Sequence, residues 1–122
     1  MNKFLLALIF SSIIFLCSCS NRMDCDELPN SYQNYEIAMS TIKAAHFKIE
    51  ETINATSSSW ISGGSFYSCD GVTGFFILKT ENQEYIYTEV PVEIWKGFKN
   101  SDSFGSYYSQ YIKHRYYFNL NK

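Results

Sequence analysis

The chain lacks the residue patterns that point directly to a metal, a nucleotide or a membrane-spanning helix. It has two histidines and no Cys-x-x-Cys pair, so no zinc site with the usual ligand spacing is recognisable. The pair Gly63-Gly64 is not followed by the Lys-Ser/Thr of a phosphate-binding loop. No run reaches the roughly 20 apolar residues that a spanning helix needs. We therefore expect neither a metal nor a cofactor.

The chain also has no large excess of positive or negative charge. Ten Lys and Arg stand against twelve Asp and Glu, which gives a formal net charge of −2 at pH 7. A nucleic-acid-binding domain commonly has a strong basic excess, and the chain as a whole has none. The composition therefore gives no general support for binding to nucleic acid.

Patterns that would predict catalysis are few. Cys69 and His114 are the one nucleophile and base to consider, but Asp70 beside Cys69 would raise the pKa of the thiol. The carboxylates Asp70, Glu84 and Glu89 form no recognisable acid–base pair. We expect that the protein is not an enzyme.

The first residues have the pattern of an export signal. A short basic start, Met1–Lys3, precedes an apolar run, Phe4–Leu16, of thirteen residues interrupted only by two serines. Leu16-Cys17-Ser18-Cys19 resembles a bacterial lipobox. We predict that residues 1–18 are a lipoprotein signal peptide and that Cys19 receives lipid. The protein would then be anchored to a membrane of the bacterial cell envelope, on its periplasmic or surface side.

Three alternatives to this reading of the N-terminus stay open. They are an ordinary secretory signal, an N-terminal membrane anchor, and lipid on Cys17 in place of Cys19. The sequence does not distinguish the inner from the outer membrane. After the signal peptide, residues 19–34 are polar and are predicted to form a tether.

Cys25 and Cys69 are the two cysteines that remain outside the signal region. In an oxidising compartment they can form a disulfide. Such a bond would close a loop of about 44 residues and stabilise the fold by ~4 kcal/mol in the chain-entropy model. The alternative, that both thiols stay unpaired, is left open because sequence does not give the distance between them.

Residues 35–56 are predicted to form an N-terminal helix. Apolar residues recur there at intervals of three and four, at Met39, Ile42, Ala45, Ile49 and Ile53. Residues 46–53 also alternate between apolar and polar side chains. A strand in place of the second half of the helix is therefore left open.

Residues 57–122 are predicted to form a separate small domain. Three segments read as strands, at residues 60–67, 74–79 and 84–88, and the connections between them are short. Helices are expected at residues 92–98 and about 104–112. The predicted fold is therefore α+β, a small three-stranded antiparallel meander followed by two helices, with an additional N-terminal helix.

Several short motifs occur in order along this domain. They are Tyr85-Ile86-Tyr87, Val90-Pro91, Ser103-Phe104-Gly105-Ser106-Tyr107-Tyr108 and Ile112-Lys113-His114-Arg115-Tyr116, preceded by Ser59-Trp60-Ile61 and Phe66-Tyr67. In this order they resemble the KTSC domain, named after the C-terminus of some lysyl-tRNA synthetases. The resemblance covers about Ser58–Leu120 and identifies Tyr85, Tyr87, Pro91 and Gly105 as its motif residues.

What the resemblance implies about function depends on the compartment. The association with a tRNA synthetase implies RNA binding, whereas an exported lipoprotein does not meet tRNA, so a nucleic-acid partner is not expected. From Trp95 to Lys122 five Lys and Arg stand against one Asp, interleaved with aromatic residues. Most of these aromatic residues are needed for the core of so small a domain. The residues left as candidate ligand-binding residues are Tyr107, Tyr111, Arg115 and Tyr116.

Three functions follow as hypotheses. The first is a membrane-tethered binding or interaction module of the cell envelope, with a protein or glycan as its partner and the membrane contacted through lipid on Cys19. The second is RNA binding, which requires that Leu16-Cys17-Ser18-Cys19 is not a lipobox. The third is an accessory structural lipoprotein. The identity of the ligand and the oligomeric state do not follow from the sequence.

Overall fold

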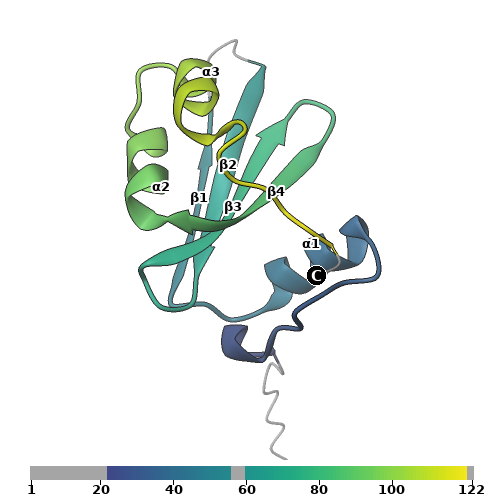
Figure 1. Cartoon of the computed structure of the whole chain (residues 1–122). Helices are drawn as coiled ribbons and strands as arrows, with labels where there is room; N and C mark the ends of the chain where they lie inside the picture. Colours follow the sequence, from purple (N-terminus) through teal and green to yellow (C-terminus); the bar gives the residue numbers. More distant parts are fainter. Residues whose placement is uncertain (1–21, 56–59, 121–122) are drawn as a thin grey trace, which may run out of the picture.

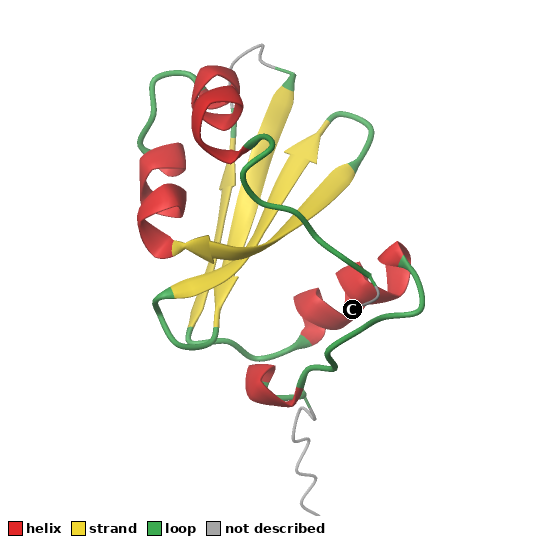
Figure 2. Ribbon diagram, viewed as in Figure 1, coloured by secondary structure: helices red, strands yellow, loops and turns green. Residues whose placement is uncertain are grey.

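The computed structural model describes residues 22–55 and 60–120. A four-stranded antiparallel sheet forms its centre, and the strands are neighbours in the order β1-β2-β3-β4. Their bounds are β1 Ile49–Asn54, β2 Ile61–Ser68, β3 Thr73–Thr80 and β4 Glu84–Pro91. The helical elements are η2 Cys25–Glu27, α1 Tyr35–Ala44, α2 Val92–Lys99, α3 Phe104–Tyr107 and the π-helix η3 Tyr108–Ile112. Figures 1 and 2 show α1 apart from the group formed by α2 and α3.

The prediction of a three-stranded meander is wrong, although the small α+β class is correct. The additional strand β1 comes from the second half of the segment predicted as a helix, and it pairs with β2 from Ile49↔Ser68 to Asn54↔Gly63. The apolar spacing could not separate the two states. Ile49 and Ile53 are four residues apart, so they share a face both in a helix and in a strand.

The N-terminal helix is accordingly shorter than the predicted residues 35–56. It begins after Asn34, whose side-chain oxygen accepts a hydrogen bond from the backbone N–H of Ile37 at 2.8 Å. It ends at Ala44, because Ala45 has extended backbone angles (φ −77°, ψ 164°). The chain can then enter β1, where the β-branched residues Ile49, Thr52 and Ile53 favour an extended backbone.

One face of the sheet packs against α2, α3 and η3. Buried aromatic rings dominate this core: Phe66 stacks on Trp95 at 5.6 Å between ring centroids, and Phe76 meets Phe98 edge-on at 4.9 Å. The edge strand β1 is tied to α2 by Glu51, whose carboxylate accepts hydrogen bonds from Trp95 Nε1 at 2.6 Å and Lys99 Nζ at 2.7 Å.

The opposite face of the sheet packs against α1 and the segments near both ends of the described chain. Ala38 and Ile42 of α1 are fully buried in the same cluster as Ile77 and Ile86. The C-terminal segment runs beside β4 and ends near the N-terminal part: Thr88 N–H donates to Tyr117 O at 3.3 Å, and Tyr32 N–H donates to Leu120 O at 3.2 Å. Each face of the sheet therefore has its own apolar core.

Strand β4 contains a bulge shortly before the chain enters α2. The register shifts between the pairs Phe76↔Tyr87 and Gly74↔Val90, and Glu89 has a positive φ of 58°. Tyr87 and Val90 are three residues apart and would face opposite sides of a regular strand. Because of the bulge, both lie in the core on the α2 side.

Residues 22–34, expected to form most of the tether, lie against the folded body. Cys25 N–H donates to His46 O at 3.0 Å, and His46 N–H donates to Met23 O at 2.8 Å. Arg22 donates to the carbonyl oxygen of Ala45 at 2.7 Å, and Tyr32 is buried. In the described ranges, no helix combines the length and apolar character needed to cross a membrane.

Candidate functional site

The exposed side of α3 and η3 holds two of the predicted binding residues in direct contact. The rings of Tyr107 and Tyr111 lie 4.6 Å apart between centroids. Tyr111 is 41% exposed, whereas Tyr107 is half-buried. A Cβ atom at Gly97 of α2 would collide with the ring and hydroxyl of Tyr107. Because Gly97 has no side chain, the Tyr107 ring has room to pack against α2.

The π-helix sets the direction of these tyrosines. Lys113 N–H donates to Tyr108 O at 2.8 Å, a bond that spans five residues where a regular α-helix spans four. The wider turn leaves Tyr111 exposed while the next residue, Ile112, is fully buried in the core. Short π-helical turns are found frequently at functional sites.

The other two predicted binding residues lie in the turn that follows. Tyr116 is half-buried and packs against the core, and Arg115 is exposed. Arg115 Nε donates to Gln110 O at 3.0 Å, so its guanidinium is held to the end of the same helix. Burial raises the pKa of Tyr107, and the neighbouring hydroxyls of Tyr111 and Tyr116 raise it further. The structure thus brings Tyr107 and Tyr111 into contact, and Arg115 and Tyr116 follow them in the turn after η3. We call this group the tyrosine surface.

The family-motif residues have mainly structural positions. The hydroxyls of Tyr87 and Tyr108 lie 2.6 Å apart, and burial followed by this hydrogen bond raises the pKa of Tyr87. Tyr85 is 37% exposed on β4. Pro91 precedes the first residue of α2, and Gly105 is the second residue of α3. These positions fit a motif that defines the turn from the sheet into the helices.

One exposed aromatic residue near this region was not among the predicted binding residues. Trp60 is 53% exposed and meets Tyr108 edge-on at 5.7 Å between ring centroids. The sequence placed Trp60 in the first strand of the domain, but β2 begins at Ile61. A tryptophan at the end of a strand carries no local pattern that separates a core role from a surface role.

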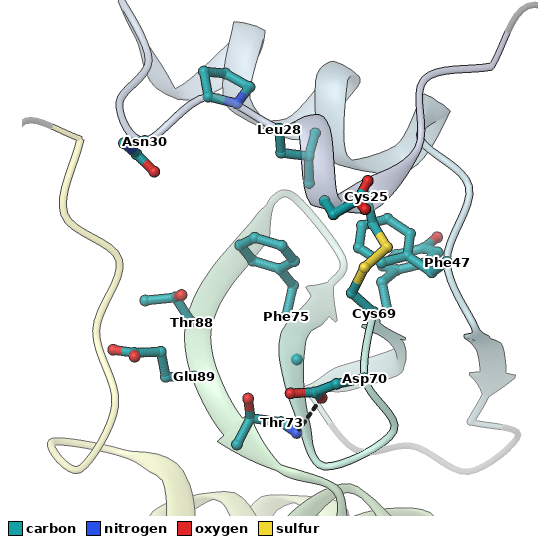
Figure 3. A pocket seen from close by; sticks show the side chains of 14 residues that line it. Cys25, Leu28, Asn30, Phe47, Cys69, Asp70, Thr73, Phe75, Thr88 and Glu89 are labelled. Atoms are coloured by element: carbon teal, nitrogen blue, oxygen red, sulfur yellow. Dashed lines mark hydrogen bonds between the residues drawn. A yellow bond between two sulfur atoms is a disulfide. The ribbon is translucent and has the colours of Figure 1, made fainter.

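A second candidate site is a cleft of about 360 Å³ beside η2 and the β2–β3 turn. Figure 3 shows Phe75 near its centre, with Leu28 and Asn30 on one side and Thr88 and Glu89 on another. Phe47 and Tyr67 extend the aromatic lining, and their rings are 5.4 Å apart. Its acidic side chains are Asp26, Asp70 and Glu89.

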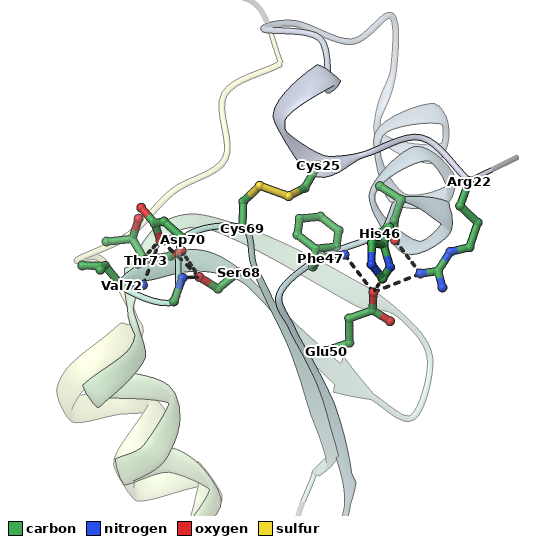
Figure 4. Close-up of a disulfide and its surroundings, with 12 residues drawn as sticks. Arg22, Cys25, His46, Phe47, Glu50, Ser68, Cys69, Asp70, Val72 and Thr73 are labelled. Atoms are coloured by element: carbon green, nitrogen blue, oxygen red, sulfur yellow. Dashed lines mark hydrogen bonds and ion pairs between the residues drawn. A yellow bond between two sulfur atoms is a disulfide. The ribbon is translucent and has the colours of Figure 1, made fainter.

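Part of the wall of this cleft is a disulfide between Cys25 and Cys69 (Figure 4), with the two Cα atoms 5.7 Å apart. It joins η2 to the turn after β2. That turn is ordered by Asp70, whose Oδ1 accepts from the backbone N–H groups of Val72 at 2.8 Å and Thr73 at 3.1 Å. These two hydrogen bonds hold the pKa of Asp70 below its ordinary value.

The disulfide leaves Cys69 unable to act as the nucleophile that was considered from the sequence. Cys69 is bonded to Cys25 and is not a free thiol that His114 could activate. Of the carboxylates considered for acid–base chemistry, Asp70 orders its own turn and Glu84 pairs with Lys43 Nζ at 2.6 Å. Over residues 22–55 and 60–120, no three His, Cys, Asp or Glu side chains are grouped so as to hold a metal ion.

The predicted lipid site cannot be placed. Cys19 lies outside the described residues, as do Ser18 and the rest of the proposed signal peptide.

Comparison with known proteins gives a match to one family model over part of the chain. The model of the KTSC domain matches residues 80–116, which run from the last residue of β3 through β4 and the helices to Tyr116. The resemblance to this domain is therefore confirmed for residues 80–116. The matched part contains all eight predicted motif and ligand-binding residues of the domain, from Tyr85 to Tyr116. No curated protein and no solved structure matches the chain.

Proposed function

We propose that the protein is an exported binding module, tethered by lipid on Cys19 to a membrane of the bacterial cell envelope, whose tyrosine surface takes a protein or glycan ligand. The observation that carries this proposal is the contact between Tyr107 and Tyr111 on the outer side of α3 and η3. Tyrosine is enriched at binding surfaces because it offers a large apolar area and a polar hydroxyl.

The core supports this assignment because it is complete without the outermost tyrosine. Phe66, Phe76, Trp95, Phe98 and Ile112 are at most 1% exposed and fill the space between the sheet and the helices. Tyr111 is not needed to close this core and remains 41% exposed. Lys113 and Arg115, which follow Tyr111 in the chain and are exposed, add positive charge, which favours an anionic group on the partner.

The disulfide supports export. Disulfides persist in oxidising compartments outside the cytoplasm and are rare inside it. Cys25 and Cys69 are 44 residues apart in the sequence and come together only in the folded domain, so their bond is part of this fold. A chain with a signal peptide and lipobox would reach such a compartment.

The binding role is tested with the mature chain in which Cys19→Ala removes the lipid site. The probes are purified cell-wall sacculi and detergent-solubilised envelope proteins, which separate a glycan from a protein partner. Tyr111→Ser is expected to weaken binding at least tenfold, about 1.4 kcal/mol. Tyr117→Ser is the matched control, because Tyr117 is 58% exposed but does not belong to the tyrosine surface. Equal affinity of the two variants, or no binding to either probe, would refute the proposal.

A further inference from the structure

The outer face of α1 is an exposed surface of mixed apolar and polar side chains beside the start of the described chain. Ile37, Ser40 and Ala44 lie on the side of the helix away from the buried residues Ala38 and Ile42. Ile37 is 40% exposed. The Ser40 hydroxyl donates back to Ile37 O at 3.2 Å, so it has a partner within the helix. Two charged side chains, Glu36 and Lys43, are exposed beside Ser40 on the same side of the helix, and Lys43 Nζ is paired with Glu84 at 2.6 Å.

Two shallow hollows make this face continuous with the N-terminal segment. One, of about 600 Å³, is lined by Arg22, Met23, Ser40, Thr41, Ala44 and Ala45. The other, of about 380 Å³, is lined by Glu36, Ile37, Met39 and Ser40. Ser40 belongs to both, and Met23 is 43% exposed. This surface therefore reaches from α1 to Arg22, and Ile37 and Met23 are its partly exposed apolar side chains.

The distance from this face to the predicted lipid site is short. Cys19 is three residues before Arg22, and three residues of extended chain span at most about 11 Å. Arg22 is itself fixed to the end of α1 by hydrogen bonds to the carbonyl oxygens of Ala44 at 3.3 Å and Ala45 at 2.7 Å. A lipid on Cys19 would therefore hold the C-terminal end of α1 close to the bilayer surface.

We propose that the outer face of α1 docks on the membrane that holds the lipid anchor, so that the domain lies on the bilayer in one orientation. This inference rests on the proposed lipidation of Cys19. The partly exposed Ile37 and Met23 suit contact at the headgroup level. A weak contact suffices, because the anchor supplies a high effective concentration of membrane. The tyrosine surface, at the α3 end of the molecule in Figure 1, then points away from the bilayer.

The test uses the lipidated protein in vesicles of phosphatidylethanolamine and phosphatidylglycerol. An environment-sensitive fluorophore is attached in Ser40→Cys on α1 and, as a matched control, in Ser109→Cys on η3, both exposed positions. Spin-labelled lipids are expected to quench the probe at position 40 at least twice as strongly as the probe at position 109. Ile37→Glu should remove most of that difference.

The outcomes separate this inference from the proposal on which it rests. The mass of the N-terminal peptide shows whether Cys19 carries lipid. A lipidated protein with equal quenching at the two positions, or stronger quenching at position 109, would overturn the docking alone. A protein without lipid on Cys19 would overturn both the docking and the lipid tether.

Discussion

Replacing both Cys25 and Cys69 with serine is expected to remove a large part of the stability of this domain. The bond closes a loop of 44 residues. In the chain-entropy model, a loop of this length corresponds to about 4 kcal/mol of unfolding free energy at 25 °C. A small domain has only roughly 5–15 kcal/mol in total. The segment that the bond fixes is otherwise held by the backbone hydrogen bonds between residues 23–25 and His46 and by the hydrogen bonds of Arg22 to Ala44 and Ala45.

Urea unfolding followed by the fluorescence of Trp60 and Trp95 measures this effect. The double variant should unfold at lower urea, and its melting temperature should fall by about 15 °C or more. Wild-type protein treated with a reductant should behave like the double variant, which separates loss of the bond from effects of the new serines. A loss of less than about 1 kcal/mol in the double variant, with an unchanged reduced wild type, would refute the reasoning.

Three further tests address individual contacts. Gly97→Ala should lower the melting temperature, a net loss of about 1–2 kcal/mol, because its Cβ displaces Tyr107 although alanine favours the helix; a rise would contradict this. Glu51→Gln should be less stable than wild type at pH 7, and in urea titrations the difference should shrink below pH 5. The reason is that the lowered pKa of Glu51, caused by hydrogen bonds from Lys99 and Trp95, gives stability that is lost as the pH falls. Tyr87→Phe and Tyr108→Phe should each cost about 1 kcal/mol in thermal unfolding, and the double variant should cost less than their sum because no hydroxyl is left unpaired; additive losses would count against the pair.

The helical half of the domain could be predicted because its signals are local. Val92, Trp95 and Phe98 recur at three-residue intervals, and α2 covers them. The residues from Phe104 to Ile112 are helical as expected, but their last turn is a π-helix. That detail depends on the packing of Ile112 into the core, which no spacing within the segment reveals.

Strand β1 could not be predicted with the same security because its evidence is non-local. The pattern at Ile49 and Ile53 fits a helix and a strand equally well. The strand is stabilised by pairing with β2 and by the contact of Glu51 with Trp95, 44 residues further along the chain. These contacts with β2 and with Trp95 stabilise the extended state of the segment relative to a helix.

The candidate site was accessible to sequence reasoning in part. Tyr107 and Tyr111 are four residues apart in a predicted helix, so their contact follows from helical geometry. The cleft was not accessible, because its lining comes from η2, from β4 and from the turn between β2 and β3. The disulfide that joins η2 to the turn between β2 and β3 was one of two alternatives that the sequence left open.

The central claim, that the protein is exported and held at a membrane through Cys19, is tested most directly by mass spectrometry. The full chain is expressed in a bacterium, extracted from the membrane fraction, and its N-terminal peptide is analysed after metabolic labelling with palmitate. The account predicts that the peptide begins at Cys19 and bears acyl chains, and that Cys19→Ala abolishes the label. A peptide that begins at Met1, or that begins at or near Cys19 without lipid, would contradict the account.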